Sequence, residues 1–123
     1  MTDKVVVLVT AGNLEEARKI ARALVGARLA ACVNLLPSLE SIYRWQGRVE
    51  SSTERLLFIK TSRQMFPEVE TEIRKLHTYT TPEIVCLPII DGSRDYLAWL
   101  DQCLATPSET DELPSPQPLT SEP

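Results

Sequence analysis

The stretch Lys4–Thr10, which reads KVVVLVT, decides the fold of this chain of 123 residues. A run of β-branched residues bounded by Ala11-Gly12-Asn13 is typical of a short β-strand. Successive side chains of a strand point to opposite faces of the sheet, and here both faces are apolar. Val5, Val7 and Val9 share one face, and Val6 and Leu8 share the other. A strand with one face in water should alternate with polar residues, so this pattern predicts a sheet that is covered on both sides.

Outward from this strand, the residue patterns predict a βαββαβ order of elements followed by a final helix. Apolar residues at helical spacing after Asn13, Met65 and Ser93 predict three helices, with Pro67 in a first turn. The turn Gln46-Gly47-Arg48 joins two strands as a hairpin. The predicted strands are Lys4–Thr10, Ala30–Trp45 with an interruption at Pro37, Val49–Thr61 and Glu83–Ile90. This order is typical of the ferredoxin-like α+β sandwich.

The two sheet faces are unequally covered in such an arrangement. Right-handed crossovers place both long helices on one face. The last strand, Glu83–Ile90, is also apolar on both faces, and Pro88 lacks an N–H donor, which places this strand at a sheet edge or a bulge. The final helix is too short to cover the second face. We therefore expect other copies of the chain to cover it, with the long hairpin reaching toward a neighbour.

The negative charge of the chain is concentrated at its C-terminal end. Residues 106–123 hold four of the 17 acidic residues and five of the nine prolines, and they contain no Lys or Arg. A segment with so few apolar residues cannot offset the entropy cost of ordering. We therefore predict a folded domain over residues 1–105 and a disordered, acidic, proline-rich tail over residues 106–123. The folded part is formally neutral, which argues against a nucleic-acid partner.

The apolar runs and the cysteines indicate whether the chain enters a membrane, is exported or forms disulfides. The apolar runs are too short for a helix that spans a bilayer, which needs about 20 residues. No charged segment with an apolar stretch and a cleavage site opens the chain, so we expect a cytoplasmic protein with no membrane partner. Cys32, Cys86 and Cys103 are odd in number and widely spaced, which favours reduced thiols over a disulfide framework.

A set of short motifs is distributed over residues 5–100. The motifs are Ala31-Cys32-Val33-Asn34, Pro37, Ser41, Tyr43, Trp45, Gly47, Glu54, Lys60-Thr61, Leu76-His77, Tyr79, Pro82-Glu83-Ile84, Gly92 and Tyr96-Leu97 with Trp99. Together they resemble the CutA divalent-cation tolerance family, over a match without a gap. Thr78, Thr80 and Thr81 depart from the family string around the histidine, where His-Pro-Tyr-Glu-Val-Pro is common.

The resemblance implies a ferredoxin-like subunit in a tightly packed homotrimer, with the sheets facing one another around a threefold axis. Such a trimer would cover the second apolar face. It is similar to the trimer of the PII signal proteins, with clefts between subunits. The family is linked to tolerance of divalent metals, copper above all. The resemblance therefore implies a non-enzymatic protein of divalent-metal response that binds divalent cations.

Three residues are candidate ligands for a divalent metal, with copper as the first choice. His77 is the single histidine, and imidazole ligates copper and zinc readily. A trimer can bring three copies of His77 together, or pair it with Glu83 or a thiol from a neighbour. Cys32 is a candidate soft ligand for Cu(I). The structural alternatives are a hydrogen-bonded His77 at the end of the second helix and a buried Cys32 that acts as a small hydrophobe.

The second candidate site is a cleft for a small anionic ligand, as a PII-like signalling module would have. Lys60 interrupts the apolar strand LLFIKT, and a lysine is seldom buried without a partner. It can pair with Glu54 or Glu83, or present its ammonium to an anion between subunits. Aromatic side chains can form the walls of this cleft or serve as interface packing. They are Tyr43, Trp45, Tyr79, Tyr96 and Trp99.

Signatures of catalysis are missing from the sequence. The chain carries no nucleophile elbow, no Walker loop and no recognisable pair of catalytic carboxylates. We therefore expect no enzyme and no organic cofactor. The third functional hypothesis, beside metal response and anion-dependent signalling, is a stable structural trimer that scaffolds a partner.

Overall fold

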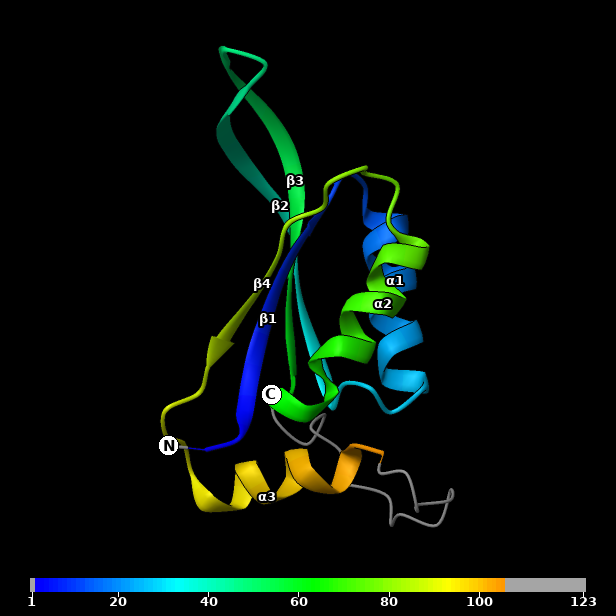
Figure 1. The fold of residues 1–123 in the computed structure, drawn as a ribbon, viewed down its shortest axis with the longest axis vertical. Coiled ribbons are helices and arrows are strands. Elements are labelled where there is room, and N and C mark those ends of the chain that lie inside the picture. The colour runs from blue at the N-terminus through cyan, green and yellow to red at the C-terminus, as the bar shows by residue number, and fades with distance from the viewer. Residues whose placement is uncertain (1, 106–123) are drawn as a thin grey trace.

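The computed structural model describes residues 2–105, which form one four-stranded sheet and three helices (Figure 1). In chain order the elements are β1 (Lys4–Ala11), α1 (Leu14–Gly26), β2 (Cys32–Trp45), β3 (Arg48–Ser62), a 3₁₀ turn (Arg63–Met65), α2 (Phe66–Leu76), β4 (Ile84–Pro88) and α3 (Arg94–Cys103). This order confirms the α+β class and the predicted βαββαβ pattern with a final helix. The predicted tail, residues 106–123, lies outside the described residues.

The strands pair in the order β2-β3-β1-β4, and every neighbouring pair is antiparallel. All four predicted strands are present: β1 is longer than predicted by one residue, β3 is longer by one residue at each end, and β2 and β4 are shorter. β2 begins at Cys32 instead of Ala30. β4 covers Ile84–Pro88 instead of Glu83–Ile90, because its partner β1 begins at Lys4 and Pro88 pairs with Val5 at that end. Pro88 lies on an edge strand, as its missing N–H predicted.

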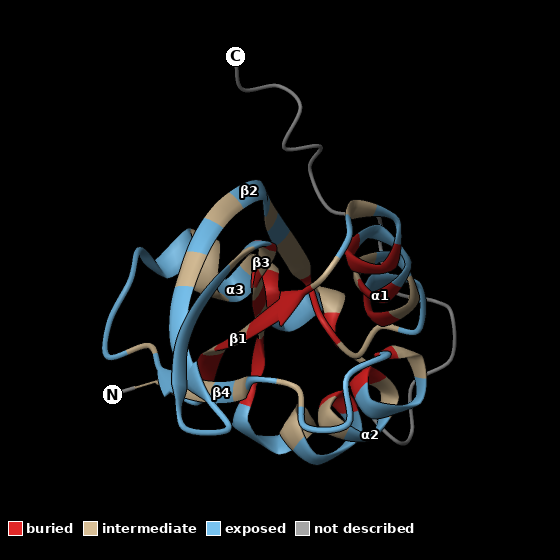
Figure 2. Ribbon diagram, turned by 90° about the horizontal axis from the view of Figure 1, so that it is seen from above, coloured by how far each residue is buried: buried red, intermediate tan, exposed pale blue. Residues whose placement is uncertain are grey.

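Helices α1 and α2 cover one face of the sheet (Figures 1 and 2). Asn13 begins α1 with its side chain accepting a hydrogen bond from Glu16 N at 2.7 Å, and Pro67 lies in the first turn of α2, both as predicted. The core between helices and sheet consists mainly of apolar side chains. Its largest members are Val7, Val9, Ile20, Leu24, Leu57, Ile59, Val69 and Ile73.

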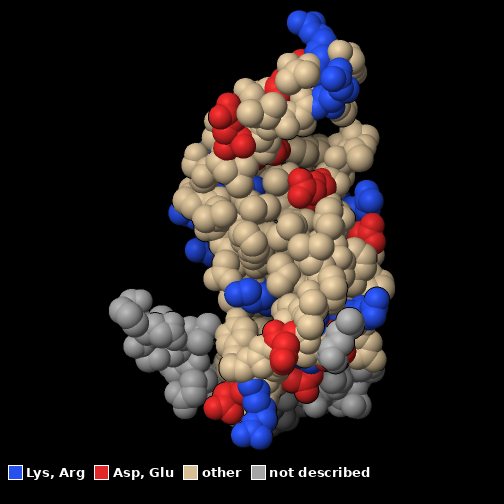
Figure 3. All heavy atoms as spheres, turned by 90° about the vertical axis from the view of Figure 1, so that its left-hand side faces the viewer, with Lys and Arg blue, Asp and Glu red and all other residues tan. Residues whose placement is uncertain are grey.

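The opposite face of the sheet has no covering layer within residues 2–105. Leu36, Val85 and Leu87 expose 47%, 42% and 43% of their surface. Figure 3, which views the side away from α1 and α2, shows few charged side chains over the middle of the molecule. The strand pairing places several more apolar residues on this face, since directly paired residues point to the same side: Val6, Leu8, Leu56 and Phe58. We call these seven residues the open face.

Strands β2 and β3 extend beyond the rest of the sheet as a long hairpin (Figure 1). Gln46 and Gly47 form its turn with φ values of 50° and 81°, the backbone conformation that a two-residue turn between twisted strands requires. Pro37 does not interrupt β2 as predicted. The pairing with β3 instead shifts register between Leu36 and Leu39, and the strand continues to Trp45.

Helix α3 lies across the end of the sheet (Figure 1). The Lys4 ammonium, on a side chain only 6% exposed, contacts Asp3 at 2.6 Å and Asp101 at 3.1 Å, which ties α3 to β1. Burial lowers the pKa of Lys4, but the hydrogen bonds with the two carboxylates outweigh burial, so the net shift of that pKa is upward. Lys4 is therefore charged at neutral pH, and it links the final helix to the first strand.

Candidate functional site

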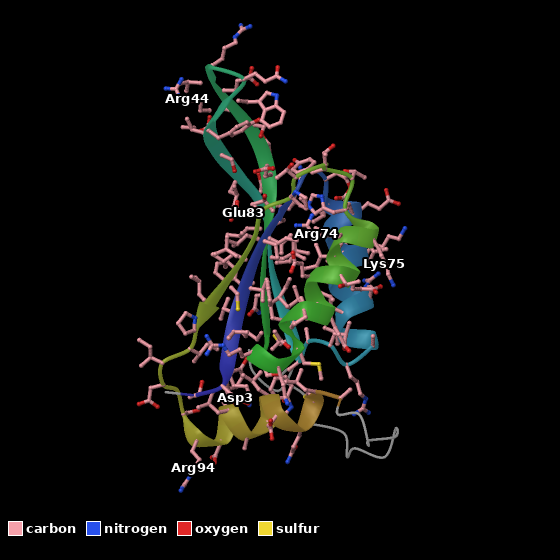
Figure 4. All side chains as sticks on the ribbon, in the orientation of Figure 1. Asp3, Arg44, Arg74, Lys75, Glu83 and Arg94 are labelled. Atoms are coloured by element: carbon pink, nitrogen blue, oxygen red, sulfur yellow. The ribbon has the colours of Figure 1, made fainter. Side chains whose placement is uncertain are left out.

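A groove of about 930 Å³ lies between the base of the β2–β3 hairpin and the loop that leads into β4. Glu83, labelled in Figure 4, lies where this loop passes the hairpin. The lining has aromatic, hydroxyl and carboxylate side chains and one aliphatic side chain, and it contains no Lys, Arg or His. Its residues are Thr10, Ser41, Ile42, Tyr43, Trp45, Glu50, Ser52, Glu54, Thr78, Tyr79, Thr80, Thr81 and Glu83.

The register of the hairpin builds one wall of this groove. On β3, Glu50, Ser52 and Glu54 alternate and so lie on one face. Tyr43 pairs with Glu50, and Ser41 pairs with Ser52, which places these side chains on the same face. The register shift after Leu36 moves β2 by one residue relative to β3, which exchanges the faces on which the side chains of β2 lie. Without it, the aromatic side of β2 would lie on the opposite face from the carboxylates.

His77 anchors the loop that forms the other wall. Its side chain is fully buried, and Nε2 lies 2.6 Å from the carbonyl oxygen of Thr10. A carbonyl oxygen only accepts hydrogen bonds, so Nε2 carries the hydrogen. Nδ1 accepts a hydrogen bond from Tyr79 N at 3.1 Å. Both ring nitrogens of His77 are therefore used inside the protein, at the C-terminal end of α2 where the structural alternative placed it.

Glu16 holds the same loop from α1. Its carboxylate is 8% exposed and accepts hydrogen bonds from Thr78 N at 3.2 Å and Thr78 Oγ1 at 2.9 Å. It also lies 3.3 Å from His77 Nδ1. Thr78, one of the three threonines that depart from the common family sequence, thus donates both of these hydrogen bonds to a buried carboxylate.

Tyr79 connects the loop to the hairpin. Its hydroxyl donates a hydrogen bond to Glu54 Oε2 at 2.8 Å, and its ring packs on Gly12, where a Cβ would lie 3.1 Å from the hydroxyl oxygen. Burial, together with the hydrogen bond to Glu54 and the charge of that carboxylate, raises the pKa of Tyr79 to about 12. The lack of a side chain at Gly12 therefore allows the tyrosine to reach a buried carboxylate.

The tyrosine can be titrated directly. The difference in tyrosinate absorbance between the wild type and Tyr79→Phe should have its midpoint near pH 12. Because the folded state favours the protonated phenol, its contribution to stability is complete below pH 10 and is lost as the pH rises toward 12. A midpoint at pH 10, the ordinary value for tyrosine, would show that the phenol does not interact with Glu54 in solution.

The candidate residues fall into two separate places. Tyr43, Trp45, Tyr79 and Glu83 line the groove together, and His77 supports its loop from behind. Other candidates gather instead where the start of β2 meets α3. There the Lys60 ammonium lies 5.8 Å from the centre of the Tyr96 ring, and Tyr96 lies against Trp99 with ring centres 5.6 Å apart. Cys32 is the residue directly opposite Lys60 on β2. We call Cys32, Lys60, Tyr96 and Trp99 the α3 cluster.

In the described part of the chain, Lys60 pairs with neither Glu54 nor Glu83, the two partners considered for it from the sequence. Its Nζ donates a hydrogen bond to Asn34 Oδ1 at 2.6 Å, and none of the ion pairs within residues 2–105 joins it to Glu54 or Glu83. Pairing with one of these glutamates, which was one of the two alternatives for Lys60, therefore does not occur within residues 2–105. Glu54 lies further up the hairpin and takes its hydrogen bond from Tyr79 instead.

The three candidate metal ligands do not meet in one chain. Over residues 2–105 no group of three or more His, Cys, Asp or Glu side chains is arranged to hold a metal ion. Cys32 belongs to the α3 cluster, Glu83 lines the groove, and the nitrogens of His77 bind Thr10 and Tyr79. A metal site that uses these residues would need donors from a neighbouring chain.

Sequence patterns did not single out Glu16, Glu50 or Ser52. The alternation of Glu50, Ser52 and Glu54 opposite Ser41 and Tyr43 was a usable signal, because paired strands present such residues on one face. For Glu16 no signal existed. An acidic residue in the first turn of a helix is expected on the surface, and its partner Thr78 lies 62 positions further along the chain.

Comparison with known proteins tests the family resemblance of the chain. The model of the family described as "CutA1 divalent ion tolerance protein" matches residues 5–103. The "Divalent-cation tolerance protein CutA" of Thermus thermophilus is 56% identical over 95 residues, which cover 77% of this chain and 92% of that protein. In residues 2–105 no helix is both long and apolar enough to cross a membrane.

Solved structures show the same fold. The divalent cation tolerance protein of Thermus thermophilus superposes with a TM-score of 0.81 at 52% identity, covering 83% of this chain and 99% of that one. The structure described as the periplasmic divalent cation tolerance protein CutA of Archaeoglobus fulgidus superposes with a TM-score of 0.79 at 39% identity, covering 81% and 97%. The family model, the sequence identities and the shared fold lead to one conclusion: this chain belongs to the CutA1 divalent ion tolerance protein family.

Proposed function

We infer that this protein is a non-enzymatic, cytoplasmic homotrimer that contributes to tolerance of divalent metals, copper in particular, by binding the cations in the groove. The observation that carries this proposal is the set of three carboxylates, Glu50, Glu54 and Glu83, in a groove whose lining contains no basic side chain. None of the ion pairs within residues 2–105 involves these carboxylates. Such a groove attracts cations, and Cu(II) is bound most strongly among the divalent first-row metals.

The proposed trimer supplies the additional metal ligands and the cover for the open face that a single chain lacks. A single groove has too few closely spaced donors to chelate an ion. The open face would be buried between subunits, as in the trimer that the family resemblance implies. The exposed side chains of Ile42 and Trp45, which are 69% and 56% exposed, place apolar surface along the hairpin where a neighbour can pack. Ligands from an adjacent subunit would then complete the coordination around Glu54 and Glu83.

The geometry favours this proposal over a site for a small anion. The anion hypothesis requires Lys60 to act together with Trp45 and Tyr79. In the chain, Trp45 and Tyr79 line an acidic groove, whereas Lys60 lies in the α3 cluster and is bound to Asn34. An anion in the groove would meet carboxylates rather than an ammonium group.

Calorimetric titration of Cu(II) and Zn(II) into the trimer tests the groove. Glu54→Gln and Glu83→Gln should each weaken Cu(II) binding by about tenfold or more, as loss of a ligand or of its support typically does. Glu40→Gln is the matched control, because Glu40 is on the same hairpin, is exposed and is absent from the groove lining. Equal affinities in the wild type and both groove variants would contradict the proposal.

A further inference from the structure

The three carboxylates of the groove are spread along it and do not converge on one point. Glu50 and Glu54 lie on one face of β3, and their separation corresponds to about 13 Å along a strand. Glu83 belongs to the other wall, where the loop before β4 passes the hairpin (Figure 4). Within residues 2–105 no three carboxylate, thiol or imidazole side chains are arranged to hold one metal ion. A single ligand that meets all three carboxylates therefore needs several positive charges along an extended molecule.

Glu54 has an oxygen atom that can accept a hydrogen bond from such a ligand. The residue lines the groove and is only 8% exposed. Its Oε2 accepts the hydrogen bond from the Tyr79 hydroxyl at 2.8 Å, whereas no hydrogen bond or ion pair in the described part of the chain reaches Oε1. Buried carboxylates normally have hydrogen-bond partners for both oxygens. An ammonium group in the groove would supply the missing donor.

Aromatic side chains line the same groove. Tyr43 is directly opposite Glu50 in the strand register, and Trp45 follows on the same face of β2. Tyr43, Trp45 and Tyr79 are 39%, 56% and 39% exposed, so their rings are accessible to a ligand. An organic ammonium group is attracted to aromatic faces, and methylene groups pack against them. These walls therefore favour a cation that carries hydrocarbon over a hydrated inorganic ion.

The size and charge of the groove limit the class of ligand further. Its volume of about 930 Å³ lies within the range of about 300–1,000 Å³ that is typical of small-molecule sites. The lining contains no basic side chain. Figure 3 shows acidic side chains below the basic tip of the hairpin. An anion is therefore disfavoured, and an extended molecule with several positive charges is favoured.

We propose that the groove binds a linear polyamine, a molecule whose ammonium groups are joined by short methylene chains. The ammonium groups contact Glu50, Glu54 and Glu83, and the methylene chains lie against Tyr43 and Trp45. A triamine such as spermidine is comparable in length to the separation of Glu50 and Glu54 along β3. The inference goes beyond metal tolerance, because it names another class of ligand and depends on the aromatic walls. Since both ligands use the carboxylates, a polyamine and a divalent metal compete for the groove.

Calorimetric titration of spermidine into the metal-free, full-length protein at low ionic strength tests this proposal. The wild type should bind spermidine more tightly than putrescine, and putrescine more tightly than butylamine, because each additional ammonium group meets another carboxylate. Glu50→Gln should lower the affinity for spermidine by about two- to fivefold, as loss of one exposed ion pair does. Glu40→Gln is the matched control, because Glu40 is exposed on the same hairpin and absent from the groove lining, and it should bind spermidine as the wild type does.

Variants of Tyr43 test the aromatic wall. Tyr43→Leu keeps every carboxylate but removes one ring, and it should lower the affinity for spermidine by about two- to fivefold. Tyr43→Phe keeps the ring and should restore most of that affinity. Thermal melting monitored by circular dichroism should give similar midpoints for both variants and the wild type, because Tyr43 is partly exposed. This measurement separates loss of the site from loss of the fold.

Two results would overturn the proposal. The first is equal affinity for spermidine and butylamine in the wild type, and the second is wild-type affinity for spermidine in Tyr43→Leu. The spermidine titration uses protein without metal, and the Cu(II) titration of the groove uses protein without polyamine. Failure of one proposal is therefore distinguishable from failure of the other.

Discussion

His77→Ala should lower the free energy of unfolding by about 3 kcal/mol, measured by urea denaturation with tryptophan fluorescence. The side chain is completely buried and makes two hydrogen bonds to backbone groups, Thr10 O and Tyr79 N. Removal of the ring leaves both groups without a partner in the interior, and each buried unpaired group costs about 1–3 kcal/mol.

Two variants control this experiment. Lys75→Ala changes an exposed residue two positions earlier on α2 and should stay within about 0.5 kcal/mol of the wild type. His77→Gln can retain part of the hydrogen bonding and should fall between the wild type and His77→Ala. If His77→Ala were as stable as Lys75→Ala, the anchoring role of this histidine would be wrong, and a ligand role would regain support.

Val85→Glu should convert the proposed trimer into single chains of 13.8 kDa, measured by size-exclusion chromatography with light scattering. Val85 is on the open face, paired with Leu8 of the central strand β1. In an assembly that covers this face, a glutamate there would be buried among the apolar side chains of the open face, next to Leu8. Burial of an unpaired charge costs several kcal/mol. In a trimer this cost would apply once in each of the three subunits.

Val25→Glu is a closely matched control for this prediction. Val25 and Val85 have the same exposed fraction, 42%, but Val25 is on α1, on the other side of the sheet. This variant should keep the wild-type mass. Retention of the oligomer in Val85→Glu would show that the open face is not the interface, and a wild type of 13.8 kDa would contradict the trimer itself.

Most of the fold could be predicted because its signals are local. The KVVVLVT run, the Asn13 cap, Pro67 in a first turn and the Gln46-Gly47 turn each depend on a few neighbouring residues, and the structure confirms all of them. The effect of Pro37 was not predictable in this way. Whether a proline ends a strand or is absorbed by a shift of register depends on the partner strand, here on how β3 continues past Leu36.

The candidate site was predicted only in part, because its residues come together through long-range pairing. The sequence motifs placed Tyr43, Trp45 and Tyr79 in one cleft, and they line the groove together, but the motifs also placed Tyr96 and Trp99 there and assigned Glu83 to a separate metal site. Lys60 was assigned to the same cleft, and only the register with Cys32 places it at the other end of β2. In each case the missing information was the position of one strand relative to another.

Both edge strands of the sheet contain a proline: Pro37 at the register shift of β2 and Pro88 at the end of β4. A proline offers no N–H to an incoming strand, and the register shift disturbs the regular row of donors along β2. Edge-to-edge growth into an open-ended fibril is therefore disfavoured, even though the chain exposes long β-strands. Contact through the open face buries apolar area without extending the sheet, so association of this chain should stop at a closed assembly and resist aggregation at high concentration.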